Sequence, residues 1–248
     1  MATTMPSTLE NAFALLCITM VSLLGFVGNG LSLRIITSNS HYQNAFGTLR
    51  TIVLLCNIQT ISVLSIWSAV VLLTGFRELS SSAYSIALIP GCLANVSFYG
   101  AILVNLLMAV NRYCAFTHYS YWTIPKARCA GIVAYFLGFL PCLPSIFEPC
   151  TLIFNAELDF RWSYSNTGCG DINSMFDTML TTSMMIIAGC IEFMTFLKIK
   201  SHNKSCISAL TMIGSALVFN IGQHFLTNKW TLFAVTTINW VATHTLDG

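Results

Sequence analysis

The chain has 248 residues, of which 55% are hydrophobic and only 8% are charged, and its mean hydropathy is +0.73. About a quarter of the residues of a soluble globular protein are charged, so this composition excludes a sizeable soluble domain and indicates a membrane protein. The net charge of +2 comes from Lys and Arg residues scattered along the chain, so there is no basic stripe for binding nucleic acid.

Seven apolar stretches long enough to cross a bilayer follow one another, and they predict an all-α bundle in one domain. The predicted spans are residues 13–36, 49–76, 86–113, 129–147, 173–196, 206–225 and 230–248. The residues before the first span include no basic residue, which favours a span with its N-terminus outside over a cleaved signal peptide. Pro141 and Pro144 should kink the outer half of the fourth span. The last span has about 19 residues, near the lower limit for crossing, and we expect no cytoplasmic tail after it.

The loop charges agree with this topology. Eight of the eleven basic residues fall on the inner side, whereas Arg77, Arg161 and Lys229 fall outside. Most acidic residues lie on the outer side: Glu10, Glu78, Glu148, Glu157, Asp159, Asp171 and Asp177. We expect no charged residue deep in the outer half of the bundle, which argues against a strongly ionic ligand.

The one sizeable loop, residues 148–172, lies outside and matures in an oxidising lumen. It contains Cys150 and Cys169, whose spacing suits a stapled hairpin, so we predict a disulfide between them. Cys92, in the outer part of the third span, is the alternative partner for either cysteine. The remaining cysteines lie in or beside spans without metal-type spacing, which is typical of small apolar core residues.

The third span ends abruptly in Asn111-Arg112-Tyr113. An arginine at the edge of hydrocarbon must reach water, headgroups or a partner, so Arg112 marks the inner end of this span. Glu192 is the one acid near the inner end of the fifth span, and we hypothesise that it pairs with Arg112. A protonated Glu192, or one that reaches Lys198 or the interface, is the alternative.

These features together resemble the rhodopsin-like G-protein-coupled receptors and, more narrowly, the nematode serpentine chemoreceptors of class X (Srx). The matching residues are Phe46 to Leu49, Asn57, Trp67, Ala109 to Ala115, Cys150, Trp162, Cys169, Trp230, Trp240, His244, Asp247 and Gly248. The chain differs from the family pattern in lacking an expected Pro shortly after Tyr113 and in its short basic loop between the fifth and sixth spans.

The resemblance implies that Asn111, Arg112 and Tyr113 couple the receptor to a heterotrimeric G protein. An arginine that only anchors the helix in the interface is the alternative. Asn29, Asn57 and Asp247 lie at similar depths in the inner half, where the resemblance implies a polar network that can hold a sodium ion. Hydrogen bonding between helices explains these three residues without an ion, and we expect only that.

Polar and aromatic residues in the outer half suit a cavity for a small organic ligand. The candidates are Asn95, Phe98, Tyr99, Gln223, His224 and Trp240. A role in helix packing or at the membrane interface is the alternative for each of them, and for any single residue we favour it. Catalytic, metal-binding and phosphate-binding motifs are absent from the sequence, so we expect no enzyme and no cofactor.

The sequence therefore predicts a chemosensory receptor that binds a small-molecule cue from outside and signals to a heterotrimeric G protein. Its expected location is the plasma membrane, and by resemblance a sensory cilium. A small polytopic transporter or channel subunit and a truncated, non-signalling receptor are the alternatives.

Overall fold

The computed structural model describes residues 8–81, 85–117, 122–156 and 160–198, together with Trp230, Phe233, Ala234 and Ile238. Its main elements are α1 (Thr8–Ser38), α2 (Ala45–Thr74), α3 (Ser85–Thr117), α4 (Ile124–Leu137), β1 (Leu152–Asn155), β2 (Arg161–Tyr164) and α5 (Gly168–Lys198). Short 3₁₀ helices occur at Ser40–Tyr42, Arg77–Ser80, Leu140–Ile146 and Glu148–Cys150. The predicted sixth span lies outside the described residues, as does most of the seventh.

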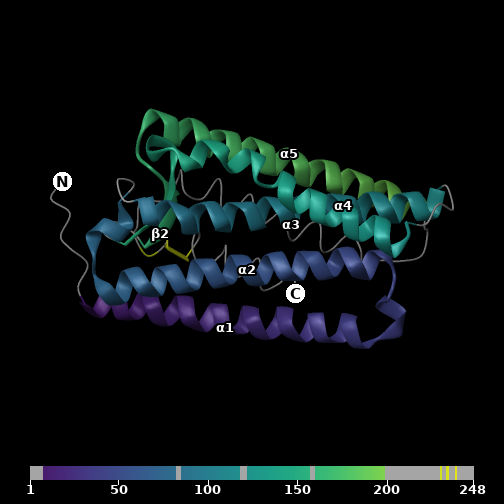
Figure 1. Cartoon of the computed structure of the whole chain (residues 1–248), viewed down its shortest axis with the longest axis horizontal. Helices are drawn as coiled ribbons and strands as arrows, with labels where there is room; N and C mark the ends of the chain where they lie inside the picture. Colours follow the sequence, from purple (N-terminus) through teal and green to yellow (C-terminus); the bar gives the residue numbers. More distant parts are fainter. Residues whose placement is uncertain are drawn as a thin grey trace.

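Five helical segments among the described residues are long and apolar enough to cross a membrane. They run side by side as a bundle, with the β-hairpin at the end where α1 begins (Figure 1). The helix α2 packs on α1, α3 and α4, and α3 also packs on α4 and α5. This arrangement makes α3 the central helix of the described part of the bundle.

The ends of α2 follow from local chemistry. The Asn44 side chain accepts a hydrogen bond from the Gly47 amide at 2.9 Å, which caps the first turn of the helix. At the other end Gly75 has φ +65°, and its amide donates to the Val71 carbonyl at 3.0 Å. A glycine adopts this left-handed conformation without a Cβ clash, so the helix can stop there.

The fourth span departs from its predicted form. Its α-helix begins at Ile124, five residues before the predicted start, and ends at Leu137. Pro141 and Pro144 lie in the 3₁₀ helix that follows rather than in a kinked α-helix. Because a proline has no amide hydrogen and clashes with the preceding turn, the two prolines break the α-helix in this half of the span.

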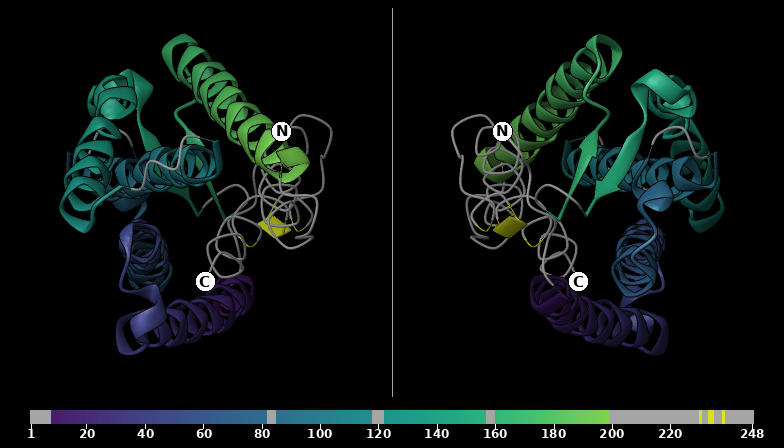
Figure 2. Two further views of the ribbon diagram at one scale, coloured as in Figure 1. Left: turned by 90° about the vertical axis from the view of Figure 1, so that its right-hand side faces the viewer. Right: turned by 90° about the vertical axis from the view of Figure 1, so that its left-hand side faces the viewer.

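The outer loop folds into an antiparallel hairpin in which Leu152 pairs with Tyr164 and Phe154 with Trp162. The strands lie at one end of the bundle, beside α3 and α5 (Figure 2). Phe154, Phe160 and Trp162 are buried with residues of α1 and α2 in one apolar cluster. The Phe160 ring lies 5.8 Å from Trp230 and 6.1 Å from Phe233, which places these two residues at the hairpin end of the bundle.

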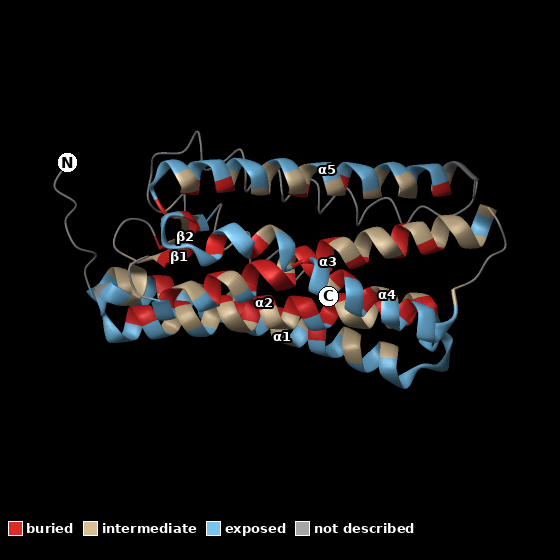
Figure 3. Ribbon diagram, turned by 45° about the horizontal axis from the view of Figure 1, so that its top comes forward, coloured by how far each residue is buried: buried red, intermediate tan, exposed pale blue. Residues whose placement is uncertain are grey.

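Large apolar side chains are exposed on the outer faces of the helices. Examples are Leu16 in α1, Ile66 in α2, Phe136 in α4 and Met179 in α5. Figure 3 shows the same pattern on α5, where buried residues form a narrow stripe and most of the surface is exposed. In a bilayer these faces contact lipid, so their exposure agrees with a membrane-spanning bundle.

Candidate functional site

The outer part of the bundle contains a carboxylate held by hydroxyl groups. Oδ1 of Asp177 in α5 accepts hydrogen bonds from Tyr99 of α3 and from Thr181, the latter at 3.3 Å. Oδ2 accepts from Tyr164 of β2 at 3.3 Å. Asn95, one turn before Tyr99, donates to the Tyr164 hydroxyl at 3.1 Å. The cluster thus joins α3, α5 and the hairpin.

The tyrosine of the hairpin is suited to act as a donor in this cluster. Burial, followed by the negative charge of Asp177, raises the pKa of Tyr164 well above its ordinary value. Its hydroxyl therefore stays protonated at neutral pH and can donate to Asp177. The hairpin is attached to the bundle through this hydrogen bond as well as through its apolar side chains.

The position of Asp177 corrects the expectation that no charged residue lies within the outer half. Helix α5 begins at Gly168, five residues before the predicted start of the fifth span. The Thr167 hydroxyl accepts from the Gly170 amide at 3.0 Å and caps this earlier first turn. Asp177 consequently lies well inside the helix. In the sequence, its spacing of four residues from Thr181 is the signal that indicates a shared helix face.

The proposed ligand residues are only partly covered by the structure. Asn95 and Tyr99 belong to the Asp177 cluster, and the Phe98 ring lies 5.7 Å from the Tyr99 ring in an edge-on contact. Gln223, His224 and Trp240 lie outside the described residues. Sequence reasoning missed Asp177 and Tyr164.

The hairpin is held to the helices at its base and along one face. A disulfide joins Cys150 to Cys169 at the start of α5, and Cys92 is a free thiol. The Trp162 indole donates to the Ser68 hydroxyl of α2 at 3.3 Å. Asn173 of α5 donates to Ser145 at 2.8 Å and to the Cys150 carbonyl at 3.1 Å. The outer end of the bundle is therefore covered by a fixed strand pair.

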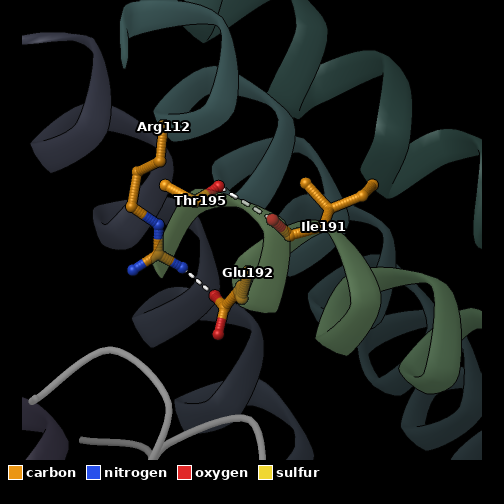
Figure 4. A network of polar contacts seen from close by, with 4 residues as sticks. All are labelled: Arg112, Ile191, Glu192 and Thr195. Carbon is orange, nitrogen blue, oxygen red and sulfur yellow. Dashed lines mark hydrogen bonds and ion pairs between the residues drawn. The ribbon is translucent and has the colours of Figure 1, made fainter. Parts of the chain in front are cut away.

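At the inner end, Arg112 of α3 forms an ion pair with Glu192 of α5 (Figure 4). The Arg112 side chain is 28% exposed and that of Glu192 is 11% exposed, so the pair is largely shielded from water. Cζ of Arg112 lies 5.4 Å from the centre of the Phe46 ring in the first turn of α2, a cation–π contact. The arginine thus links α2, α3 and α5.

The neighbours of Arg112 differ in burial. Asn111 is buried and Tyr113 is partly buried. Thr195, one turn from Glu192, donates its hydroxyl to the Ile191 carbonyl at 2.8 Å and so does not compete for the carboxylate (Figure 4). The arrangement leaves Glu192 available to Arg112.

Two residues of the inner polar network meet between α1 and α2. Asn57 donates to Oδ1 of Asn29 at 3.4 Å, and Asn29 donates to the Gly25 carbonyl at 2.9 Å. Both side chains are fully buried. Asp247, the third predicted member, lies outside the described residues. Within the described ranges, no group of three or more His, Cys, Asp or Glu residues could hold a metal ion.

The arrangement of the helices matches that of a solved membrane protein. The structure of squid rhodopsin superimposes on the chain with a TM-score of 0.70 at 10% sequence identity, covering 98% of this chain and 81% of rhodopsin. The fold is therefore that of the rhodopsin-like seven-helix bundle, as the sequence predicted.

The family follows from the sequence itself. The model of the serpentine type seven-transmembrane G-protein-coupled chemoreceptors, Srx, matches residues 19–208. The chain belongs to this Srx family, which confirms the resemblance, and it is a receptor of the G-protein-coupled type rather than an enzyme. No curated protein sequence matches the chain.

Proposed function

We propose that the protein is a plasma-membrane chemoreceptor that binds a small-molecule cue from the outer side and activates a heterotrimeric G protein through Arg112. Membership of the Srx family supports the receptor class. The observation that carries the coupling role is the Arg112 to Glu192 ion pair at the inner ends of α3 and α5.

The ion pair suits a resting state. Glu192 holds the Arg112 guanidinium between the helices, away from a partner at the membrane surface. Separating a largely shielded pair leaves each charge without its counter-ion, which costs free energy and so favours the paired arrangement. Any motion that separates α3 from α5 would then release Arg112 toward a G protein.

Nucleotide exchange on purified G proteins tests this proposal. Membranes containing the wild type, Glu192→Gln, Arg112→Gln or the double variant are mixed with heterotrimers of each Gα class. A pair worth about 1 kcal/mol shifts a two-state population roughly fivefold, so Glu192→Gln should raise basal exchange by about that factor. Arg112→Gln should abolish the increase in the double variant.

Glu148→Gln, an exposed change on the outer side, is the matched control and should leave exchange unchanged. Equal surface expression of all variants is verified first by antibody binding to an N-terminal epitope. Unchanged basal exchange in Glu192→Gln would contradict the resting-state role of the pair.

A further inference from the structure

The Asp177 cluster differs from the inner ion pair in its charge balance. Its three hydrogen-bond donors, Tyr99, Tyr164 and Thr181, are all neutral hydroxyls. Among the described residues, no Lys, Arg or His forms an ion pair with Asp177, whereas Glu192 has Arg112. An ionised Asp177 therefore carries a negative charge that the described residues do not compensate.

The hydrogen bonds leave room at one carboxylate oxygen. An ionised carboxylate has about four acceptor positions. Oδ1 uses two of them for Tyr99 and Thr181, while Oδ2 accepts one long bond of 3.3 Å from Tyr164. By this count of acceptor positions, Oδ2 can accept a further hydrogen bond.

The side chains around the carboxylate favour a positive group. Tyr99 and Tyr164 both direct their hydroxyl groups at the Asp177 carboxylate, and the Phe98 ring contacts the Tyr99 ring. A charged hydrogen bond to a carboxylate is about twice as strong as a neutral one.

We propose that Asp177 is the recognition anion for a small organic ammonium ligand, whose N–H donates to Oδ2 beside Tyr164. The proposal deepens the proposed function, since it assigns a chemical class to the cue that the receptor binds. It also connects the two ends of the bundle. Tyr99 and Asp177 join α3 to α5 on the outer side, and Arg112 and Glu192 join the same helices about 20 Å further in.

The test uses the full chain purified in detergent and measures its melting temperature. The probes are methylammonium chloride and phenethylammonium chloride. Methylammonium is the smaller of the two, with only two non-hydrogen atoms. Sodium chloride at equal ionic strength controls for screening, and 2-phenylethanol offers the same carbon skeleton without charge. Asp177→Asn removes the anion, and Asp171→Asn, an exposed position in the first turn of α5, is the matched control.

We expect at least one ammonium probe to raise the melting temperature of the wild type and of Asp171→Asn by about 2 °C or more. Asp177→Asn should lose this shift, and 2-phenylethanol should produce none. Absence of a shift in the wild type, or a shift that persists in Asp177→Asn, would overturn the proposal. This experiment contains no G protein, so its failure is distinguishable from a failure of coupling.

Tyr164→Phe provides a second test that keeps the carboxylate, in case Asp177→Asn does not fold. Because Oδ2 no longer accepts from Tyr164, the half-maximal concentration of phenethylammonium should fall severalfold. An unchanged or higher concentration would count against binding at Oδ2.

Discussion

Gly91 of α3 lies directly against β1: a Cβ atom at Gly91 would be 2.0 Å from the backbone carbonyl oxygen of Leu152. No side chain can be accommodated at that distance without moving the strand or the helix. The close approach lets the hairpin pack into the outer end of the bundle, where Tyr164 reaches Asp177 and Trp162 reaches Ser68.

Replacing this glycine should therefore displace the hairpin. We expect Gly91→Ala to lower the free energy of unfolding by about 1–3 kcal/mol, the usual cost of overpacking, because the obstacle is backbone rather than a flexible side chain. Thermal unfolding of the purified receptor measures the effect. Gly30→Ala in α1 is the control, since nothing lies within 4 Å of its Cβ position. Equal stability of the two variants would contradict the close approach.

The Cys150 to Cys169 disulfide closes a loop that contains the whole hairpin, with a sequence separation of 19. Its removal in Cys150→Ser or Cys169→Ser should destabilise the protein by about 3 kcal/mol, through greater freedom of the unfolded loop. The double variant should be no worse than either single one. Cys92→Ser separates the two possible pairings: it should leave the melting temperature unchanged, and a loss as large as that of Cys150→Ser would favour pairing through Cys92.

The sequence predicts how deep a residue lies in the membrane. It predicts only partly which residues of the neighbouring helices that residue contacts. The apolar runs place Arg112 and Glu192 at the inner ends of their spans, and the two residues meet in the structure. The same reasoning places Asn29 and Asn57 at one level, and they also meet.

The outer cluster could not be predicted in this way. The predicted fifth span begins at residue 173, so Asp177 falls in its first turn and counts among the acidic residues of the outer side. Thr167 caps α5 five residues earlier, which places Asp177 further inside the helix. Its bond with Tyr99 depends on which faces of α3 and α5 meet. Apolar side chains are exposed to lipid as well as buried in this bundle, so hydrophobic periodicity does not identify the contact faces.

The Asn29 and Asn57 pair is expected to contribute modestly to stability. A double-mutant cycle with Asn29→Ala and Asn57→Ala should give a coupling energy of about 0.6 kcal/mol, the average for hydrogen bonds between membrane helices. Reversible unfolding of the four proteins in the same detergent provides the measurement. A coupling energy of zero would show that the two amides contribute independently, each through its own helix.

The orientation of the bundle can be checked with a pair of introduced cysteines. Glu78→Cys lies in the exposed turn after α2, on the same side as the hairpin, and His41→Cys lies in the exposed turn between α1 and α2. The excess of basic residues on the side of His41 predicts that this side faces the cytoplasm. A membrane-impermeant maleimide should therefore label Glu78→Cys on intact cells and His41→Cys only after permeabilisation, each above the level of the parental chain. Labelling of His41→Cys on intact cells would show that the topology is the reverse of the predicted one. Arg112 would then lie on the outer side of the membrane, where no G protein could reach it.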